Sequence, residues 1–150
     1  MYVGHPRLPE GFKADTAAMW ISSVPTAFVQ FGHQHMWSSW QSTTFYRTFW
    51  VAQEQLVVEQ ANATTTASNS TTTLTLIADD MAIVRVNGQE VGKTVLFPRQ
   101  SSLQVSELRT GHNLIELQCQ GTEGPPSVVA SLVGPRGSVL LQTDHTWNWL

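Results

Sequence analysis

The stretch that decides the fold runs from Thr73 to Gly92 and reads TLTLIADDMAIVRVNGQEVG. Its first four residues alternate between threonine and leucine, and apolar residues return at every second position from Ala82 to Val86. A period of two is typical of strands that bury one face. Asp79 and Asp80 interrupt the apolar run between the two segments. The pattern therefore predicts two strands that are joined at an acidic corner.

A tight turn closes the second of these strands. Asn87 and Gly88 form a dipeptide that accepts positive φ at both central positions, as a type I′ hairpin requires. Val91 then starts the return strand. The strands, the corner and the hairpin together fit into about twenty residues. Each strand therefore has the length of an ordinary short strand.

Composition limits the classes of function. The chain has 150 residues, the size of one domain. Charged residues make up 13% of it, against about 25% in ordinary soluble domains. A surface with so few charges is poorly protected against association, which favours a protein that packs against partners. The net charge of −3, without a cluster of Lys or Arg, argues against nucleic acid as a partner.

The single cysteine and the N-terminus bear on the compartment. Cys119 has no partner for an internal disulfide and lies in an apolar run, so we expect a buried, inert thiol. The N-terminal residues lack the apolar core of a signal peptide, and no apolar run approaches the length of a membrane span. We therefore expect synthesis in the cytosol without a signal peptide, unless a leader has been removed, and no membrane insertion.

Turn residues divide the rest of the chain into short segments. Residues 1–16 carry Pro and Gly without periodicity and are interpreted as an extended N-terminal arm, and residues 17–150 as a single β-sandwich domain. Residues 62–73 are almost all Asn, Ser, Thr and Ala and are interpreted as an exposed loop. This loop contains N-glycosylation sequons at Asn62 and Asn69, whose use stays open. Besides the segments above, strands are expected at 18–23, 27–33, 43–52, 94–97, 103–108, 114–120, 127–133, 138–141 and, closing the chain, 143–149.

Several short motifs occur in one order along the chain: Trp20-Ile21, Phe45-Tyr46-Arg47-Thr48-Phe49, Ala78-Asp79-Asp80, Val86-Asn87-Gly88, Val105 with Leu108, Gly111 and Asn113, and Thr143-Asp144-His145-Thr146-Trp147. Together they resemble the galactose-binding-domain-like β-sandwiches, which are jelly-roll modules of glycoside hydrolases, lectins, and cell-surface and viral proteins. The resemblance implies an all-β jelly roll with about eight strands in two antiparallel sheets. It also implies structural roles for Trp20, Asp79, Asp80, Asn87, Gly88, Asp144 and Trp147.

The acidic pair is the first candidate for chemistry. Paired carboxylates such as Asp79 and Asp80 can act as acid and base on a glycoside. A corner between strands also needs side-chain acceptors for its amides, and Asp supplies them. The structural interpretation is preferred, because the resemblance implies it. The sequence has no nucleophile elbow, phosphate loop or cofactor fingerprint, so we expect neither an enzyme nor a cofactor.

A ring-rich loop is the candidate ligand site. His33, His35, Trp37 and Trp40 lie within eight residues of one another. Sugar rings can stack on indole, and the imidazoles can contact the hydroxyls. Alternatively, the indoles cap the open end of the sandwich or lie in a protein interface. Two histidines are too few for a closed zinc site, and no dense acidic loop predicts calcium, so no metal is expected.

Two hypotheses for function follow. The first is a non-catalytic structural or assembly protein that docks on other protein subunits of a larger complex, such as a minor capsid component of a virion. The low charge, the expected arm at residues 1–16 and the lack of a signal peptide favour it. The alternative is a carbohydrate-binding module that recognises glycans through Trp37 and Trp40. The assembly hypothesis is placed slightly ahead.

Overall fold

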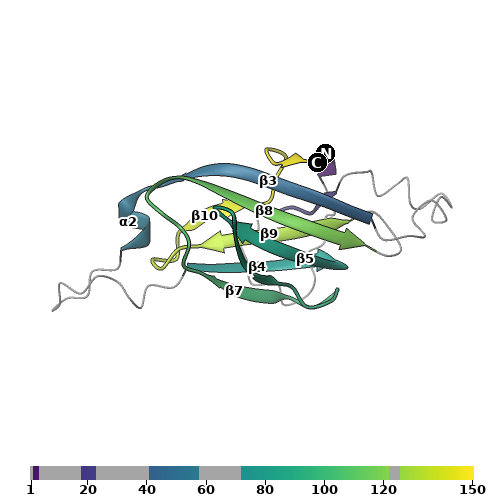
Figure 1. Ribbon diagram of the computed structural model, residues 1–150. Coiled ribbons are helices and arrows are strands. Elements are labelled where there is room, and N and C mark those ends of the chain that lie inside the picture. The colour runs from purple at the N-terminus through teal and green to yellow at the C-terminus, as the bar shows by residue number, and fades with distance from the viewer. Residues whose placement is uncertain (1, 4–17, 23–40, 58–71, 122–125) are drawn as a thin grey trace.

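The chain folds into two antiparallel β-sheets (Figure 1). The computed structural model describes residues 2–3, 18–22, 41–57, 72–121 and 126–150. The six-stranded sheet, sheet A, contains β1 (Tyr2–Val3), β2 (Ile21–Ser22), β4 (Thr72–Asp79), β7 (Ser101–Val105), β9 (Ser127–Val133) and β10 (Val139–Gln142). The five-stranded sheet, sheet B, contains β3 (Gln41–Val51), β5 (Met81–Val86), β6 (Gln89–Lys93), β8 (Gly111–Gly121) and β11 (Asn148–Trp149).

These strands confirm the all-β prediction. The described residues contain one helix, the single turn α2 (Gln53–Leu56), in which the Gln55 side chain accepts a hydrogen bond from the Ala52 amide at 2.8 Å. The described residues hold eleven strands rather than about eight, and three of the eleven are only two residues long. The described residues contain no helix that is long and apolar enough to cross a membrane.

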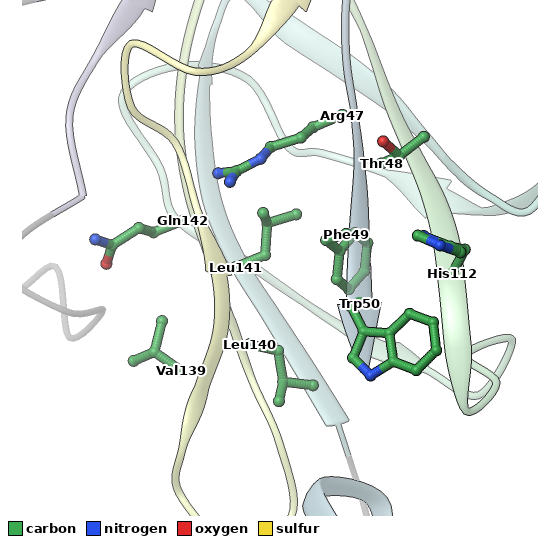
Figure 2. Close-up of a pocket in the computed structure, with 9 residues that line it drawn as sticks. All are labelled: Arg47, Thr48, Phe49, Trp50, His112, Val139, Leu140, Leu141 and Gln142. Atoms are coloured by element: carbon green, nitrogen blue, oxygen red, sulfur yellow. The ribbon is translucent and has the colours of Figure 1, made fainter. Parts of the chain in front are cut away.

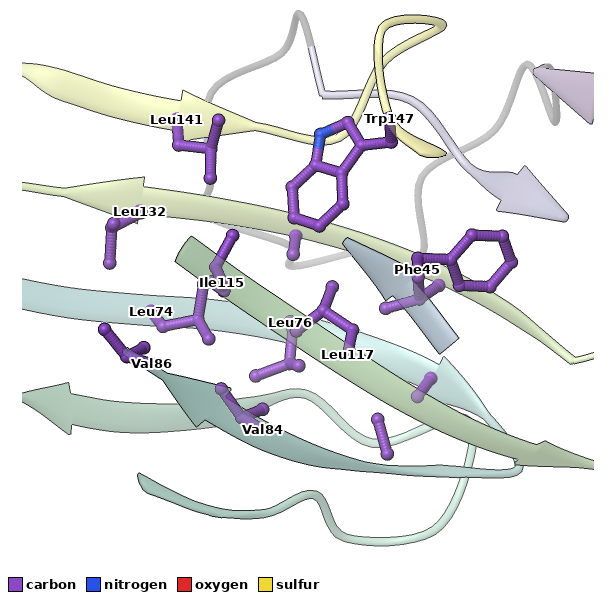
Figure 3. Packing of buried hydrophobic residues seen from close by; sticks show 14 of the residues in the cluster. Phe45, Leu74, Leu76, Val84, Val86, Ile115, Leu117, Leu132, Leu141 and Trp147 are labelled. Atoms are coloured by element: carbon purple, nitrogen blue, oxygen red, sulfur yellow. The ribbon is translucent and has the colours of Figure 1, made fainter. Parts of the chain in front are cut away.

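Alternation along the strands produces the core. In sheet A the strand order is β1-β2-β9-β4-β7, with β10 also paired to β9, and in sheet B it is β11-β3-β8-β5-β6. Every second residue of the long strands points between the sheets and is buried, at up to about 1.5–3 kcal/mol for each large apolar side chain. Figure 3 shows this packing, which includes Phe45, Leu74, Leu76, Val84, Val86, Ile115, Leu117, Leu132, Leu141 and Trp147. Cys119 belongs to the same core, as predicted, and burial raises the pKa of its thiol.

The decisive stretch connects the two layers. β4 lies in sheet A and β5 in sheet B, so the chain changes sheets at Asp79 and Asp80. The Asp80 amide donates to the Gln120 carbonyl at 2.8 Å, and its carbonyl accepts from the Phe97 amide at 3.0 Å. These bonds tie the corner to two other segments, which confirms the corner predicted from the sequence.

The hairpin between β5 and β6 has the predicted turn geometry. Asn87 and Gly88 have φ values of 51° and 83°, which are the positive values that a type I′ turn requires. The Asn87 side chain accepts from the Leu114 amide at 2.9 Å and donates to the Glu107 carbonyl and to Asn113 Oδ1, both at 2.9 Å. One side chain therefore fixes the turn against β8 and the preceding loop.

The closing motif fixes the C-terminal segment. Trp147 is 4% exposed and donates from its indole Nε1 to the Gln142 carbonyl at 2.9 Å. The buried Thr143 hydroxyl donates to the Met19 carbonyl at 2.7 Å and accepts from the Ala130 amide at 3.0 Å. Asp144 accepts hydrogen bonds from the amide and hydroxyl of Thr146. The motif thus joins three segments that are distant in the sequence.

Trp20 is buried and packs with Ala18, Ile77 and Val129 in a second cluster beside the main core. One of the expected strands is wrong. Residues 94–97 are not a strand: the Val95 amide is bonded to the Ser101 hydroxyl at 2.9 Å instead of to a ladder. Trp149 does not share the environment of the buried Trp147, since it is 46% exposed.

Candidate functional site

An exposed pair of rings lies on the outer face of sheet B. Trp50 on β3 and His112 on β8 are cross-strand partners, with ring centroids 4.9 Å apart and planes at 88°. Phe49 and Val51 are buried toward the core, so alternation turns Trp50 outward. Its side chain is 64% exposed (Figure 2). An indole this exposed contributes little to the core and is available to a ligand.

The turn before β8 supports this ring pair. Gly111 has a φ of 98°, and a Cβ built there would lie 4.0 Å from Cζ3 of Trp50, so the indole lies close to the turn backbone. Asn113 stabilises the turn through hydrogen bonds to the Arg109 amide and carbonyl at 3.0 and 2.8 Å. Arg109 also donates from Nε to the His112 carbonyl at 3.1 Å. The Arg109 side chain is therefore held against the backbone of His112.

A pocket of about 530 Å³ opens beside the rings, where the edges of the two sheets approach each other. It lies between β3 and β10, and Figure 2 shows Phe49 and Leu141 between these strands, with Trp50 and His112 on the opposite side of β3. Its lining residues are Arg47, Thr48, Phe49, Trp50, His112, Val139, Leu140, Leu141 and Gln142. Five of these nine side chains are apolar or aromatic, and four are polar.

One ion pair borders the pocket. Arg47 lies 3.6 Å from Asp144. Partial burial would raise the pKa of Asp144, but the Thr146 hydrogen bonds and the charges of Arg47 and His145 outweigh it, so the pKa lies below its ordinary value. Gln142 Oε1 is buried and has no hydrogen-bond partner. Arg47 is thus engaged within the fold, whereas Gln142 retains an unused acceptor.

The ring pair has the chemistry of a sugar-binding surface. An exposed indole offers an apolar face on which the C–H face of a pyranose can stack, and its neighbours can hydrogen-bond the hydroxyls. Exposed Thr48 lies on the same face two residues before Trp50, and the His112 imidazole adds a second polar group. Aromatic and polar groups therefore meet on one accessible surface.

The acidic corner at Asp79 and Asp80 contains a carboxyl group with a raised pKa. Burial, a hydrogen bond between the two side chains and the charge of Asp80 raise the pKa of Asp79 to about 6. The Asp79 carboxyl therefore keeps its proton to a higher pH than an ordinary aspartate does. No three His, Cys, Asp or Glu side chains in the described parts of the chain are grouped so that they could hold a metal ion. The structural interpretation of Asp79 and Asp80 stays a prediction.

The ligand site predicted from the sequence lies in a part of the chain that the structure does not describe. His33, His35, Trp37 and Trp40 fall outside the described residues, so their role stays a prediction. The sequence analysis missed Trp50 and His112. Trp50 carried a signal, because it is a large aromatic residue at an outward position of an alternating strand. His112 carried none, since only the pairing of β3 with β8 brings it to Trp50.

Solved structures share this architecture. A GH78 family rhamnosidase from Bacillus sp. GL1 matches over 75% of this chain with 19% identity and a TM-score of 0.59. The Pleurotus ostreatus lectin in complex with GalNAc matches over 87% with 18% identity and a TM-score of 0.55. The matches are consistent with the galactose-binding-domain-like β-sandwich that the sequence resembles. At these identities the likeness shows the fold alone.

The matched regions are parts of larger proteins. This chain corresponds to 13% of the rhamnosidase chain and 37% of the lectin chain. A rhamnosidase from Streptomyces avermitilis, complexed with L-rhamnose, matches over 75% of this chain with 20% identity and a TM-score of 0.50, and this chain covers 10% of it. No protein-family model matches the sequence, and no curated protein matches it. None of the structures named here is a viral protein, so the capsid role gains no support from them.

Proposed function

We propose that this chain is a non-catalytic carbohydrate-binding module. The observation that carries the proposal is the Trp50–His112 ring pair, exposed on the face of sheet B and bordered by polar groups. Lectin and glycosidase structures share the fold, which supports a glycan ligand over the assembly role as the primary function. The Asp79–Asp80 pair is engaged in the corner, which supports a binding role without catalysis.

The binding mode follows from the geometry of the ring pair. One pyranose stacks on the Trp50 indole, and the His112 imidazole and the Thr48 hydroxyl hydrogen-bond its hydroxyls. The turn at Gly111 leaves room beside the indole, because it has no side chain. A site of this kind recognises a single terminal sugar or one residue of a chain. Trp37 and Trp40 are proposed as a second contact for a longer glycan.

A glycan array followed by calorimetric titration tests the proposal. Trp50→Ala removes the stacking surface, so binding of the selected glycan should weaken at least about tenfold, equivalent to about 1.4 kcal/mol. Trp149→Ala is the matched control, since Trp149 is also an exposed indole but lies on β11 away from His112. Equal affinity in wild type and Trp50→Ala would refute the site, and a protein that binds no glycan would refute the function.

The predicted loop needs its own variant. Trp37→Ala combined with Trp40→Ala should weaken binding of oligosaccharides more than that of monosaccharides if the loop supplies the second contact. If this double variant abolishes monosaccharide binding while Trp50→Ala leaves it intact, the primary site is the loop predicted from the sequence.

A further inference from the structure

One edge of β3 is only partly paired. β8 pairs with β3 along its whole length, from Gln41 to Val51. On the other edge, β11 pairs with Phe45 and Tyr46, and Leu150 bonds to Thr44. No described residue pairs with this edge from position 47 to position 51. The C-terminal segment thus covers half of the edge, and the other half is open as far as the described residues go.

The hydrogen-bonding groups of the open half can be assigned. Thr44 and Leu150 exchange both backbone hydrogen bonds, at 2.9 and 3.3 Å, so the Thr44 amide and carbonyl point toward β11. Backbone groups alternate in direction along an antiparallel strand. The pairing of β3 with β8 has no register shift, so Tyr46, Thr48 and Trp50 point the same way. Thr48 and Trp50 therefore each present an amide and a carbonyl to the open edge.

The side chains do not protect this edge. Natural sheets block open edges with charged residues, proline, bulges or a covering segment. The sequence here is Thr48-Phe49-Trp50-Val51, which is uncharged, β-branched or aromatic, and without proline. The nearest charge, Arg47, is already paired with Asp144. Such an edge is a template for another strand.

We propose that a second copy of this chain pairs with this edge in antiparallel orientation, β3 against β3. A two-fold axis at Phe49 pairs Thr48 of each copy with Trp50 of the other, and each of the two pairs exchanges two backbone hydrogen bonds. These pairs combine an aromatic with a β-branched side chain, which is a favourable cross-strand combination.

Neighbouring registers fit less well. An axis at Thr48 would pair Trp50 with Tyr46, whose edge is already occupied by Asn148. An axis at Trp50 would pair Thr48 with Ala52, which lies beyond the end of β3. The axis at Phe49 uses only the free groups of the strand. The self-complementarity of this register favours a second copy over an unrelated peptide.

The other sheet contributes to the same contact. β10 pairs with β9 on one side and has no described partner on the other. Val139 and Leu140 line the pocket beside β3, and Val139 is 39% exposed (Figure 2). Pairing of the two β3 strands brings the open sides of both sandwiches together. These apolar side chains then lose contact with water in the dimer.

The arrangement also affects ligand binding, a consequence that rests on the proposed function. In this register the two Trp50 side chains are diagonal neighbours on one face, about 7–8 Å apart. Both rings remain on the outer face of sheet B. The dimer therefore presents two sugar sites side by side and should bind clustered glycans more tightly than single ones.

Site-directed crosslinking tests the register without any sugar. Thr48→Cys and Trp50→Cys are made as separate variants and mixed under mild oxidation. In the proposed register these positions face each other across the axis, at about 5.5 Å between Cα atoms, which suits a disulfide. In either variant alone, the two new cysteines are diagonal and beyond about 7 Å. The native Cys119 is buried and does not compete.

The expected result is a disulfide-linked dimer in the mixture and much less of it in either variant alone. Absence of the crosslink in the mixture, or equal crosslinking in the single variants, would overturn the register.

Sedimentation velocity from about 1 to about 100 µM tests the association itself. Wild type and Thr48→Val should be dimers, because valine keeps the backbone amide. Thr48→Pro should be a monomer with an unchanged circular dichroism spectrum, because it removes an amide that faces the open edge and not β8. A monomeric wild type, or a Thr48→Pro variant that stays dimeric, would overturn the proposal. A dimer that binds no glycan refutes the proposed function but not the pairing.

Discussion

Asn87 shows at the scale of one residue how the sequence determines the turn. Asn-Gly was recognisable from the sequence because its requirement for positive φ is local. The side-chain bonds of Asn87 to Glu107, Asn113 and Leu114 were not, because they depend on where β8 and its preceding loop lie. The backbone conformation of a turn can be predicted from a dipeptide. The tertiary contacts of the same residues can be predicted only when the fold is known.

Two substitutions separate these contributions. Asn87→Gly keeps the positive φ but loses the side-chain bonds, so it should lower the free energy of unfolding by about 1–3 kcal/mol. Asn87→Ala also strains the backbone and should cost about 1 kcal/mol more. Urea denaturation measures both values. A glycine variant as stable as wild type would mean that the side-chain bonds contribute nothing.

Asp79 gives the protein a pH dependence. Its pKa rises from 3.8 to about 6 in the folded state, through burial and the neighbouring Asp80, so the folded state holds the proton more tightly than the unfolded state. The resulting stabilisation is complete below pH about 4 and is lost as the pH rises through about 6. The free energy of unfolding should therefore fall over this range.

Asp79→Asn should remove this part of the pH dependence, and Glu90→Gln, an exposed carboxylate on β6, should leave it in place. Denaturation curves at a series of pH values check this. Parallel profiles for wild type and Asp79→Asn would show that another group causes the change.

At the scale of elements, alternation of apolar residues predicted most of the strands. It failed at residues 94–97, where the Ser101 hydroxyl and the Asp80 carbonyl take the amides that a ladder would use. The family resemblance implied a structural role for Trp147, which is buried, whereas Trp149 two residues later is 46% exposed. Pattern alone could not reveal that β11 begins after Trp147 and lies on the edge of sheet B.

The two tryptophans of this segment should differ in their effect on stability. Trp147→Ala removes a buried ring and the donor to the Gln142 carbonyl, so it should cost about 3–5 kcal/mol. Trp149→Ala removes a half-exposed ring and should change the stability by about 0.5 kcal/mol or less. Thermal and urea denaturation of both variants check the difference. Equal effects would mean that Trp147 is not part of the core.

The candidate site was only half predictable at this scale. The outward direction of Trp50 follows from the alternation along β3. The approach of His112 follows from the pairing of two strands that are distant in the sequence, and a single sequence does not contain that register.

At the scale of the whole molecule, two facing sheets enclose an apolar core and present broad outer faces. The low charge of the chain, which favoured an assembly role in the sequence analysis, also suits a module whose open β3 edge pairs with a second copy. Sugar binding uses the outward side chains of Thr48 and Trp50, and pairing uses mainly the backbone groups at the edge of the same strand. One dimer can therefore carry out both proposed roles, sugar binding and β3 pairing.

The most direct test of sugar binding is an NMR titration that follows the six tryptophan indole N–H signals. L-rhamnose and GalNAc, the sugars in two of the structurally similar complexes, are the first ligands to add. Trp50→Phe assigns the Trp50 signal by its disappearance. Addition of a binding sugar should shift the Trp50 signal in a saturable way and leave the Trp149 signal unchanged. A Trp50 signal that stays fixed while a sugar binds, or a full panel of sugars that moves no indole signal, would contradict the account.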